Sequence, residues 1–299
     1  MIKKVKLVII RNLRSLFYSI KDFINPRKAK SIAFCRNLII NKSGFEVGGP
    51  STLLFSKKGV LPLYPYVKSL DNCNFSKQTI WDGLIEEGNT FKYDENRKNG
   101  YQYILESTEL SKIPSGCYDF VLSSHVIEHI ANPIKALYEW IRILKNNGNL
   151  IVVIPHKDGT FDHNRKITAL SHMVDDFNSN MKEDDLTHLE EILEFHDFDN
   201  DIGIKSPGEF KERAMKNLEN RSLHHHVFDT YAAFKLIDYV KLKILIVESI
   251  PPCDILIVAR KSQDHDNSDI KTKLENYRFK NPLKTNESLF LSININNVS

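Results

Sequence analysis

The sequence lacks the features that mark several broad classes of protein. It has only four cysteines (Cys35, Cys73, Cys117 and Cys253), and they are widely separated with no CxxC spacing. This spacing argues against a cysteine zinc motif and a disulfide framework, so we expect reduced thiols and a cytoplasmic location. No internal repeat is evident. Charged residues interrupt every apolar run well before the roughly 20 residues that a membrane-spanning helix needs.

The chain also has little excess of charge. Its 41 basic and 38 acidic residues leave a formal net charge of +3, which argues against a nucleic-acid partner and suits a small-molecule or glycan acceptor. The exception is residues 1–35, where nine Lys or Arg in the first thirty positions face the single acid Asp22. Apolar residues there recur at helical spacing and predict a basic amphipathic helix. Packing on the domain is the expected role, with peripheral contact to the inner face of a membrane, or to a partner, left open.

From Gly44 onward, short apolar runs alternate with helical patterns, which is typical of a parallel sheet covered by helices. The expected strands are 43–47, 59–66, 101–105, 118–124, 149–155, 243–248 and 254–259. The last two are too close for a crossover helix and should pair antiparallel. Asn132 and Pro133 cap a helix between the fourth and fifth strands, and Asp229 caps a later one.

The chain organisation follows from where this alternation holds and where it stops. Residues 36–261 should form one domain, interrupted after the fifth strand by a helical, His-rich insertion over residues 157–222. Residues 262–299 are rich in Asn, Lys, Ser and Asp, and we expect a flexible tail. The sequence therefore predicts a doubly wound α/β protein with a seven-stranded, mostly parallel sheet.

In such a sheet, ligands bind beyond the carboxyl ends of the strands. The first expected strand ends in Glu46, Val47, Gly48 and Gly49, where glycines let the backbone approach a ligand. An ordinary tight turn with an exposed glutamate is the alternative reading of these residues alone.

Residues 119–130 (DFVLSSHVIEHI), the Asn132-Pro133 helix start and the segment 144–150 (LKNNGNL) occur in the order of a recognised pattern. Together with Glu46, two residues before the first glycine of the loop, they resemble class I methyltransferases that depend on S-adenosylmethionine (SAM), of the type-11-like kind. The resemblance covers roughly residues 44–261. It implies a Rossmann-like fold with SAM as the cofactor.

The resemblance also assigns roles by position. Residues around the amino-acid part of SAM would be Glu46, Gly48 and Gly49, and those near adenine would be Glu106 and Ser107. Ser123, Ser124 and His125 would lie beneath the sulfonium and the methyl group. Each of these side chains has a surface or capping role as its alternative.

Two positions depart from the family pattern. Pro50 stands where the loop usually offers a further glycine. The acid expected to bind the ribose after the second strand is missing from its simplest place, which Tyr64 or Pro65 occupies, and Asp71 is the candidate substitute.

Methyl transfer to a hydroxyl needs a group that removes a proton, and histidine suits this task near neutral pH. His156 and His125 end adjacent strands and are the candidate catalytic residues, with His156 preferred; His129 is expected to be structural. The histidines of the insertion favour an acceptor pocket. No HExxH-like spacing supports a metal, so no metal site is predicted, although His188 with Glu191, or His163 with Asp162, could supply ligands.

The sequence therefore predicts methyl transfer to a hydroxyl, less readily an amine, of a small polar or sugar acceptor. The alternative is a non-catalytic binding or scaffold module that keeps the fold. An NAD-dependent oxidoreductase would need a GxGxxG loop, which is absent. The acceptor's identity and the oligomeric state stay open.

Overall fold

The computed structural model describes residues 28–79, 83–199, 201, 204, 206–277 and 289–293. Most of the amphipathic helix expected over residues 1–35 lies outside these ranges. Within them, helix α2 (Ile32–Ile39) buries Cys35, Leu38 and Ile39. No helix among the described residues is both long enough and apolar enough to cross a membrane.

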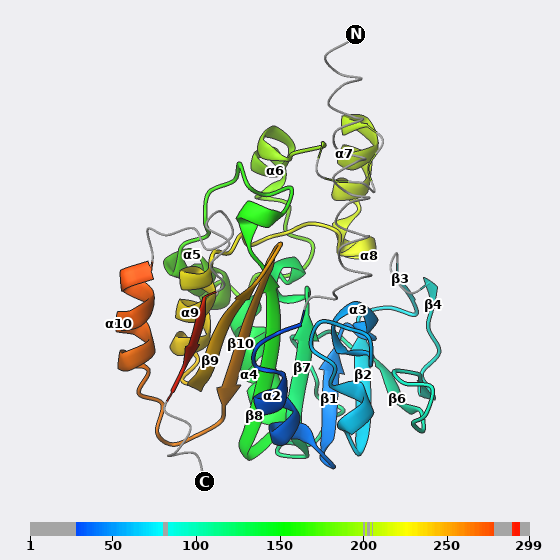
Figure 1. The fold of residues 1–299 in the computed structure, drawn as a ribbon. Coiled ribbons are helices and arrows are strands. Elements are labelled where there is room, and N and C mark those ends of the chain that lie inside the picture. The colour runs from blue at the N-terminus through cyan, green and yellow to red at the C-terminus, as the bar shows by residue number, and fades with distance from the viewer. Residues whose placement is uncertain are drawn as a thin grey trace.

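The centre of the protein is a nine-stranded sheet in the order β11-β9-β10-β8-β7-β1-β2-β6-β5 (Figure 1). Its strands are β1 (Ser43–Val47), β2 (Ser69–Asn74), β5 (Gly88–Phe91), β6 (Gly100–Ile104), β7 (Tyr118–Ser124), β8 (Leu144–Pro155), β9 (Lys243–Ile250), β10 (Asp254–Arg260) and β11 (Phe290–Ser292). A separate small hairpin joins β3 (Gln78–Thr79) to β4 (Gly83–Leu84).

Pairing in the sheet confirms the predicted fold class. Strands β6, β2, β1, β7 and β8 are parallel neighbours, and β10 runs antiparallel to both β8 and β9. The expected antiparallel pair near the end of the domain is therefore confirmed. The sheet has nine strands rather than seven because β5 and β11 extend its two edges, each in antiparallel pairing.

The prediction of a second strand over residues 59–66 is wrong. This segment is a turn that ends in the 3₁₀ helix η1 (Tyr64–Tyr66), and the strand that pairs with β1 is β2. Pro62 and Pro65 have no N–H to donate to a sheet ladder, whereas Leu61 and Leu63 are buried as part of the packing beneath the sheet. Apolar content alone therefore pointed to the wrong segment.

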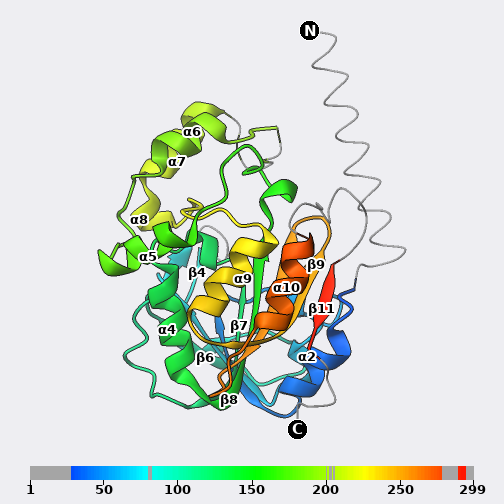
Figure 2. The ribbon, with the colours of Figure 1, turned by 90° about the vertical axis from the view of Figure 1, so that its left-hand side faces the viewer.

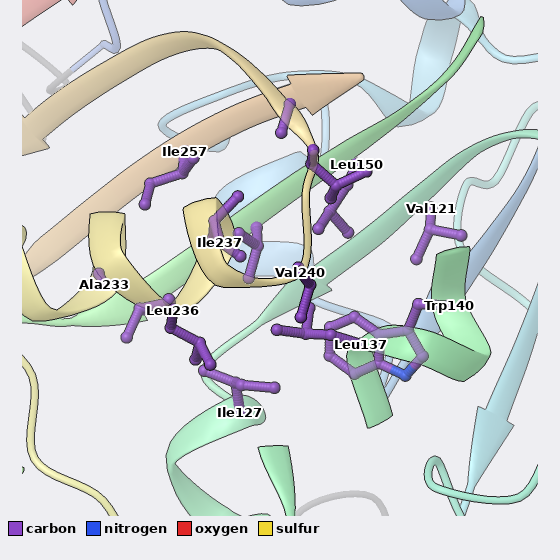
Figure 3. Close-up of a cluster of buried hydrophobic side chains, with 14 of the residues drawn as sticks. Val121, Ile127, Leu137, Trp140, Leu150, Ala233, Leu236, Ile237, Val240 and Ile257 are labelled. Atoms are coloured by element: carbon purple, nitrogen blue, oxygen red, sulfur yellow. The ribbon is translucent and has the colours of Figure 1, made fainter. Parts of the chain in front are cut away.

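Helices cover both faces of the sheet. One face carries α4 (Pro133–Ile143), α9 (Thr230–Tyr239) and α10 (Ser268–Tyr277), and the other carries α2 and the short α3 (Thr52–Phe55) (Figure 2). Figure 3 shows Leu137, Trp140 and Ile237 from the helices beside Val121 and Leu150 of the sheet. A strand buried on both faces explains the continuous apolar runs in β7 and β8.

The predicted helix caps are confirmed. The Asn132 side chain accepts a hydrogen bond from the Lys135 N–H at 3.0 Å, with Pro133 at the first position of α4. The Asp229 carboxylate accepts one from the Ala232 N–H at 2.7 Å and begins α9. Both caps satisfy backbone donors that have no partner within the helix.

In the structure, the insertion is the whole segment between β8 and α9, residues 156–229. It lies over the carboxyl edge of the sheet (Figures 1 and 2). Its helices are α5 (Leu170–Asn178), α6 (Leu189–Phe195), α7 (Pro207–Met215) and α8 (Asn217–Asn220). Two 3₁₀ turns, η2 (Ile127–His129) and η3 (Lys157–Gly159), follow β7 and β8 at the same edge. A small separate core of Ile192, Phe210, Ala214 and Leu223 holds part of the insertion together.

The expectation of a flexible tail over residues 262–299 also needs correction. Helix α10 and strand β11 lie within it, and α10 packs against α9. Ile270 and Leu274, one helical turn apart, are buried in the main core. Two apolar residues among many polar ones give a weak sequence signal, although they are enough to anchor one face of a helix.

Candidate functional site

The segments expected to bind the cofactor meet at one edge of the sheet. In the parallel ladders, Val47 at the end of β1 pairs with Cys73 of β2 and with Ser123 of β7. Asn74 at the end of β2 pairs with Ile104 at the end of β6. The residues that follow these four strands therefore surround one region beneath the insertion.

The glycine loop after β1 lies tightly against its neighbours. Gly48 has a φ of +75°, and a Cβ there would stand 2.5 Å from Cγ2 of Val126. The Gly49 N–H donates to Oδ1 of Asn72 at 2.9 Å, and Nδ2 of Asn72 donates to the Gly49 carbonyl at 3.2 Å. A cavity of about 400 Å³ adjoins this loop at Gly49 and Pro50. Glycine is required at position 48 for both conformation and space.

Glu46 is fully buried beneath that loop. Its carboxylate accepts hydrogen bonds from the Tyr64 hydroxyl at 2.8 and 2.9 Å and from the Ser51 N–H at 3.1 Å. Burial and the adjacent carboxylate raise the pKa of Tyr64 well above its ordinary value. Glu46 therefore holds the loop through the chain's own donors, and its predicted contact with a cofactor stays a prediction.

The corrected position of β2 changes the residues near the expected ribose site. Asn74 ends the strand, and neither Tyr64 nor Pro65 stands there. Asp71 accepts hydrogen bonds from the Tyr101 N–H at 2.8 Å and from the Tyr118 hydroxyl at 2.7 Å. Both partners lie at the amino ends of β6 and β7, away from the carboxyl edge where a cofactor would bind. Asp71 therefore does not replace the missing acid. Sequence reasoning missed Asn74 because it placed the strand ten residues too early.

The region expected to bind adenine is covered by an arginine of the insertion. Arg221 forms an ion pair with Glu106, lies 3.4 Å from Oε2 of Glu183, and places its guanidinium 5.0 Å from the ring centre of Phe75. Burial raises the pKa of Glu106, and Arg221 opposes that shift. The Ser107 carbonyl accepts from Nε1 of Trp140 at 3.2 Å, which fixes this segment to α4.

The end of β7 presents Ser123, Ser124 and His125. Ser123 is fully buried, and within the described part of the chain its hydroxyl has no hydrogen-bond partner. His125 has a φ of +54°, and its Nε2 lies 2.8 Å from Oδ1 of Asp254 on β10. Burial lowers the pKa of His125, but the hydrogen bond to Asp254 and the nearby Glu128 outweigh it and raise the pKa. Sequence gave no signal for Asp254, which lies 129 positions away.

His156 follows Pro155, the last residue of β8, and one of its ring nitrogens already has a hydrogen-bond partner. Its Nδ1 accepts from the Asp158 N–H at 3.2 Å, so the side chain caps η3. Burial lowers the pKa of His156, and Asp158 and Asp229 oppose that shift. Among the described residues, no contact joins His156 to His125. The catalytic role of His156 stays a prediction.

Histidines of the insertion gather in two places. Nε2 of His172 lies 3.0 Å from Nε2 of His188, near His225 and His226, whose pKa values burial lowers, to about 3 for His225. His224 lies beside His129 and Phe161 instead. Of the two metal pairs considered from sequence, His188 and Glu191 stand 3.9 Å apart, and His163 is paired with Asp197.

Comparison with known proteins agrees with this arrangement. Residues 79–152 match the profile of the family described as a methyltransferase domain. That match and the strand order identify a class I SAM-dependent methyltransferase domain in this chain, and SAM is the cofactor of that class. No curated protein sequence matches the chain.

Solved structures with a similar fold include three SAM-dependent methyltransferases. One from Methanosarcina mazei shares 13% identity over 77% of this chain and 98% of its own, with a TM-score of 0.44. One from Thermotoga maritima is described as a possible histamine N-methyltransferase. It shares 15% identity over 83% of this chain and 97% of its own, with a TM-score of 0.42. One from Aquifex aeolicus shares 11% identity over 77% of this chain and 88% of its own, also with a TM-score of 0.42.

The residues present fit SAM. The loop of Gly48 and Gly49 has no side chains to block a ligand, and the buried Ser123 hydroxyl next to it is without a partner in the described chain. Phe75 and Glu106 offer a ring face and a carboxylate beyond β2 and β6, where Arg221 now lies. Arg221 must share or leave that position if adenine is to occupy it.

Proposed function

We propose that this domain transfers a methyl group to a hydroxyl, less readily an amine, of a small polar acceptor such as a sugar or glycan intermediate. The observation that carries the proposal is the pair of His125 and Asp254, whose side chains meet at 2.8 Å where β7 ends. A histidine oriented by a carboxylate is a common arrangement for a general base.

In this proposal each side chain has a task. A carboxylate only accepts hydrogen bonds, so the contact with Asp254 requires the proton of His125 to be on Nε2. Nδ1 is then the basic nitrogen, able to take the proton of an acceptor hydroxyl as the oxygen is methylated. Bound SAM supplies a methyl group made electrophilic by the sulfonium. Ser123 and Ser124 line the same strand end and help to hold the reacting groups in position.

The insertion supports a polar acceptor. It brings Phe161, His196 and His224 into ring contact over the same edge of the sheet. Phe161 is only half-buried and offers a ring that can stack on an apolar sugar face, while the buried His196 and His224, bonded to Asp201 and Asp162, hold it in place. His156 caps η3 beside this edge, so we assign the base to His125 ahead of His156.

Two variants test the role of the pair. His125→Ala and Asp254→Asn should each lower turnover by roughly 10²- to 10⁴-fold, while the Kd for SAM, measured by calorimetry, changes by less than about threefold. His265→Ala, an exposed histidine outside the sheet, is the matched control. A panel of hydroxyl and amine acceptors identifies the atom methylated. Full turnover in His125→Ala would remove this residue from the mechanism.

One observation favours the alternative of a non-catalytic binding module. Arg221 covers Phe75 and pairs with Glu106, where the adenine of SAM is expected. Calorimetry with SAM on the wild type and on Arg221→Ala separates the two functions. Binding by either protein supports the enzyme, with tighter binding by the variant if Arg221 competes with adenine. Absence of binding by both supports the scaffold.

A further inference from the structure

Glu128, in the turn after β7, has a buried carboxylate that accepts no hydrogen bond from the described residues. Glu128 in η2 is 1% exposed, and within the described part of the chain neither of its carboxylate oxygens has a hydrogen-bond partner. An ionised carboxylate in that position is strongly unfavourable unless a cation or a proton accompanies it. No lysine or arginine forms an ion pair with it among the described residues. Its close neighbours are histidines.

Two of those histidines place a nitrogen next to the carboxylate. Nε2 of His129 is 3.9 Å from Oε1 of Glu128, and one ligand atom each from Glu128, His129 and His224 all lie within 4.8 Å of one another. Zinc bonds of about 2.0–2.1 Å in a tetrahedron separate the ligand atoms by roughly 3.3 Å. Shortening these separations by at most about 1.5 Å, through side-chain rotations, would bring the three atoms onto one ion.

In both His129 and His224, Nδ1 already has a hydrogen-bond partner. Nδ1 of His129 lies 3.0 Å from the Leu223 carbonyl, an acceptor, so this nitrogen carries the proton. Nδ1 of His224 lies 2.5 Å from Oδ2 of Asp162, and Arg165 in turn holds Asp162 through Nη1 at 2.9 Å. Nε2 is then the unprotonated nitrogen in both rings, and in His129 it lies 3.9 Å from Oε1 of Glu128. Histidines that bind metals are oriented in this way by a carbonyl or a carboxylate.

We propose that Glu128, His129 and His224 bind one divalent transition-metal ion, with zinc the best match to two imidazoles and a carboxylate. The ion neutralises the buried carboxylate and ties the turn after β7 to the segment that follows α8. Three protein ligands leave a fourth position open. His125 is the adjacent side chain, with Nδ1 at 4.0 Å from Oε1 of Glu128, so the ion would lie beside the acceptor region.

A second cluster in the same insertion serves as the matched control. His172, Asp176 and His226 also bring three ligand atoms within 4.8 Å. There, however, the His172 side chain is 41% exposed and its Nε2 already contacts Nε2 of His188 at 3.0 Å. Nε2 of His226, which lies 3.7 Å from Oδ2 of Asp176, also contacts the Ala131 carbonyl at 3.4 Å, so this nitrogen carries a proton and presents no lone pair to a metal ion. The first cluster is therefore the better-prepared site.

The test is zinc binding by the full chain. Protein stripped with EDTA is titrated with Zn²⁺ against a chromophoric chelator, and bound metal is counted by mass spectrometry. We expect one ion per chain. His224→Ala and Glu128→Gln should each weaken affinity at least 100-fold, Asp162→Asn by roughly 10- to 100-fold, and His172→Ala by less than about threefold. Loss in His172→Ala with retention in His224→Ala would place the ion elsewhere and overturn the proposal.

Folding of the variants is checked separately. Glu128→Gln keeps the shape of the side chain and removes its charge, so in EDTA it should melt at or above the temperature of the wild type. Zinc should then raise the melting temperature of the wild type and leave that of Glu128→Gln unchanged. Equal zinc-induced shifts in both proteins, or no zinc uptake by the wild type, would refute the site. These readouts do not depend on methyl transfer.

Discussion

Two buried glutamates at the same edge of the sheet have opposite surroundings. Glu46, in β1, is fully buried and accepts hydrogen bonds from Tyr64 and Ser51. Glu128, in η2, is equally buried and accepts none within the described residues. The loop after β1 is thus stable through its own contacts, whereas the turn beneath the insertion needs something further, a proton or an ion.

The contrast extends to the two regions as a whole. Most buried polar atoms without a hydrogen-bond partner in the described chain belong to the insertion or face it. Those of the insertion are on Asp176, Glu183, His196, Arg213, Arg221, Ser222, His225 and His226. Native proteins leave few such atoms, and each calls for an explanation such as an ion, a water molecule or a ligand. The incomplete hydrogen bonding therefore distinguishes the insertion interface from the glycine loop.

The largest expected effect concerns the closeness of packing at the loop. Gly48→Val should lower the free energy of unfolding by about 2 to 5 kcal/mol. The substitution forces a β-branched residue into the left-handed backbone conformation, and its side chain clashes with Val126. Gly116→Val is the control, since Gly116 has a φ of +66° but no atom within 4 Å of its Cβ position. It should lose only about 1 to 2 kcal/mol in denaturant unfolding. Equal losses of unfolding free energy in the two variants would mean that the Val126 side chain moves aside at little cost.

A smaller effect is expected at the partner of Glu46. Tyr64→Phe removes a donor from a buried carboxylate and should lower the free energy of unfolding by about 1.5 to 3 kcal/mol. Tyr66→Phe, two residues on, should change it by less than about 0.5 kcal/mol, because no hydrogen bond of its hydroxyl is found in the described chain. A loss in Tyr64→Phe no larger than in Tyr66→Phe would show that Glu46 is satisfied by other means.

The smallest effect depends on pH. Burial raises the pKa of Glu183 to about 7; Arg221 opposes this shift, and Glu106 and Asp184 add to it. An unfolded glutamate titrates near about 4.3, so the stability tied to the neutral form is complete below that pH and is lost as pH rises through about 7. Glu183→Gln should therefore be more stable than wild type by about 1 to 2 kcal/mol at high pH, since loss of the contact with Arg221 offsets part of the gain.

Unfolding measured at two values of pH, one near 4 and one near 8, checks this difference. It should be close to zero at the lower pH and largest at the higher one. A difference that stays constant with pH would mean that Glu183 has the same pKa in the folded and unfolded states. The comparison between variant and wild type cancels the other titrating groups.

Local signals made the central part of the fold predictable. The unit of β7, α4 and β8 was predictable because Asn132 and Pro133 mark the helix start and two unbroken apolar runs mark the strands. Strand β2 was not, because Asn72 and Asn74 are buried and polar. Their burial is tolerated because Asn72 bonds to Gly49 and to Gln102, contacts that no local pattern reveals.

The sequence by itself determined the α/β fold class, the ends of β1 and β7, and His125 as the second candidate base after His156, because these depend on neighbouring residues. Only the tertiary structure decided the partners. Asp254 joins His125, Arg221 joins Glu106, and Glu128 meets His224 across long stretches of chain. The reason is physical: burial and charge compensation depend on which side chains share a volume, and that is a property of the folded chain.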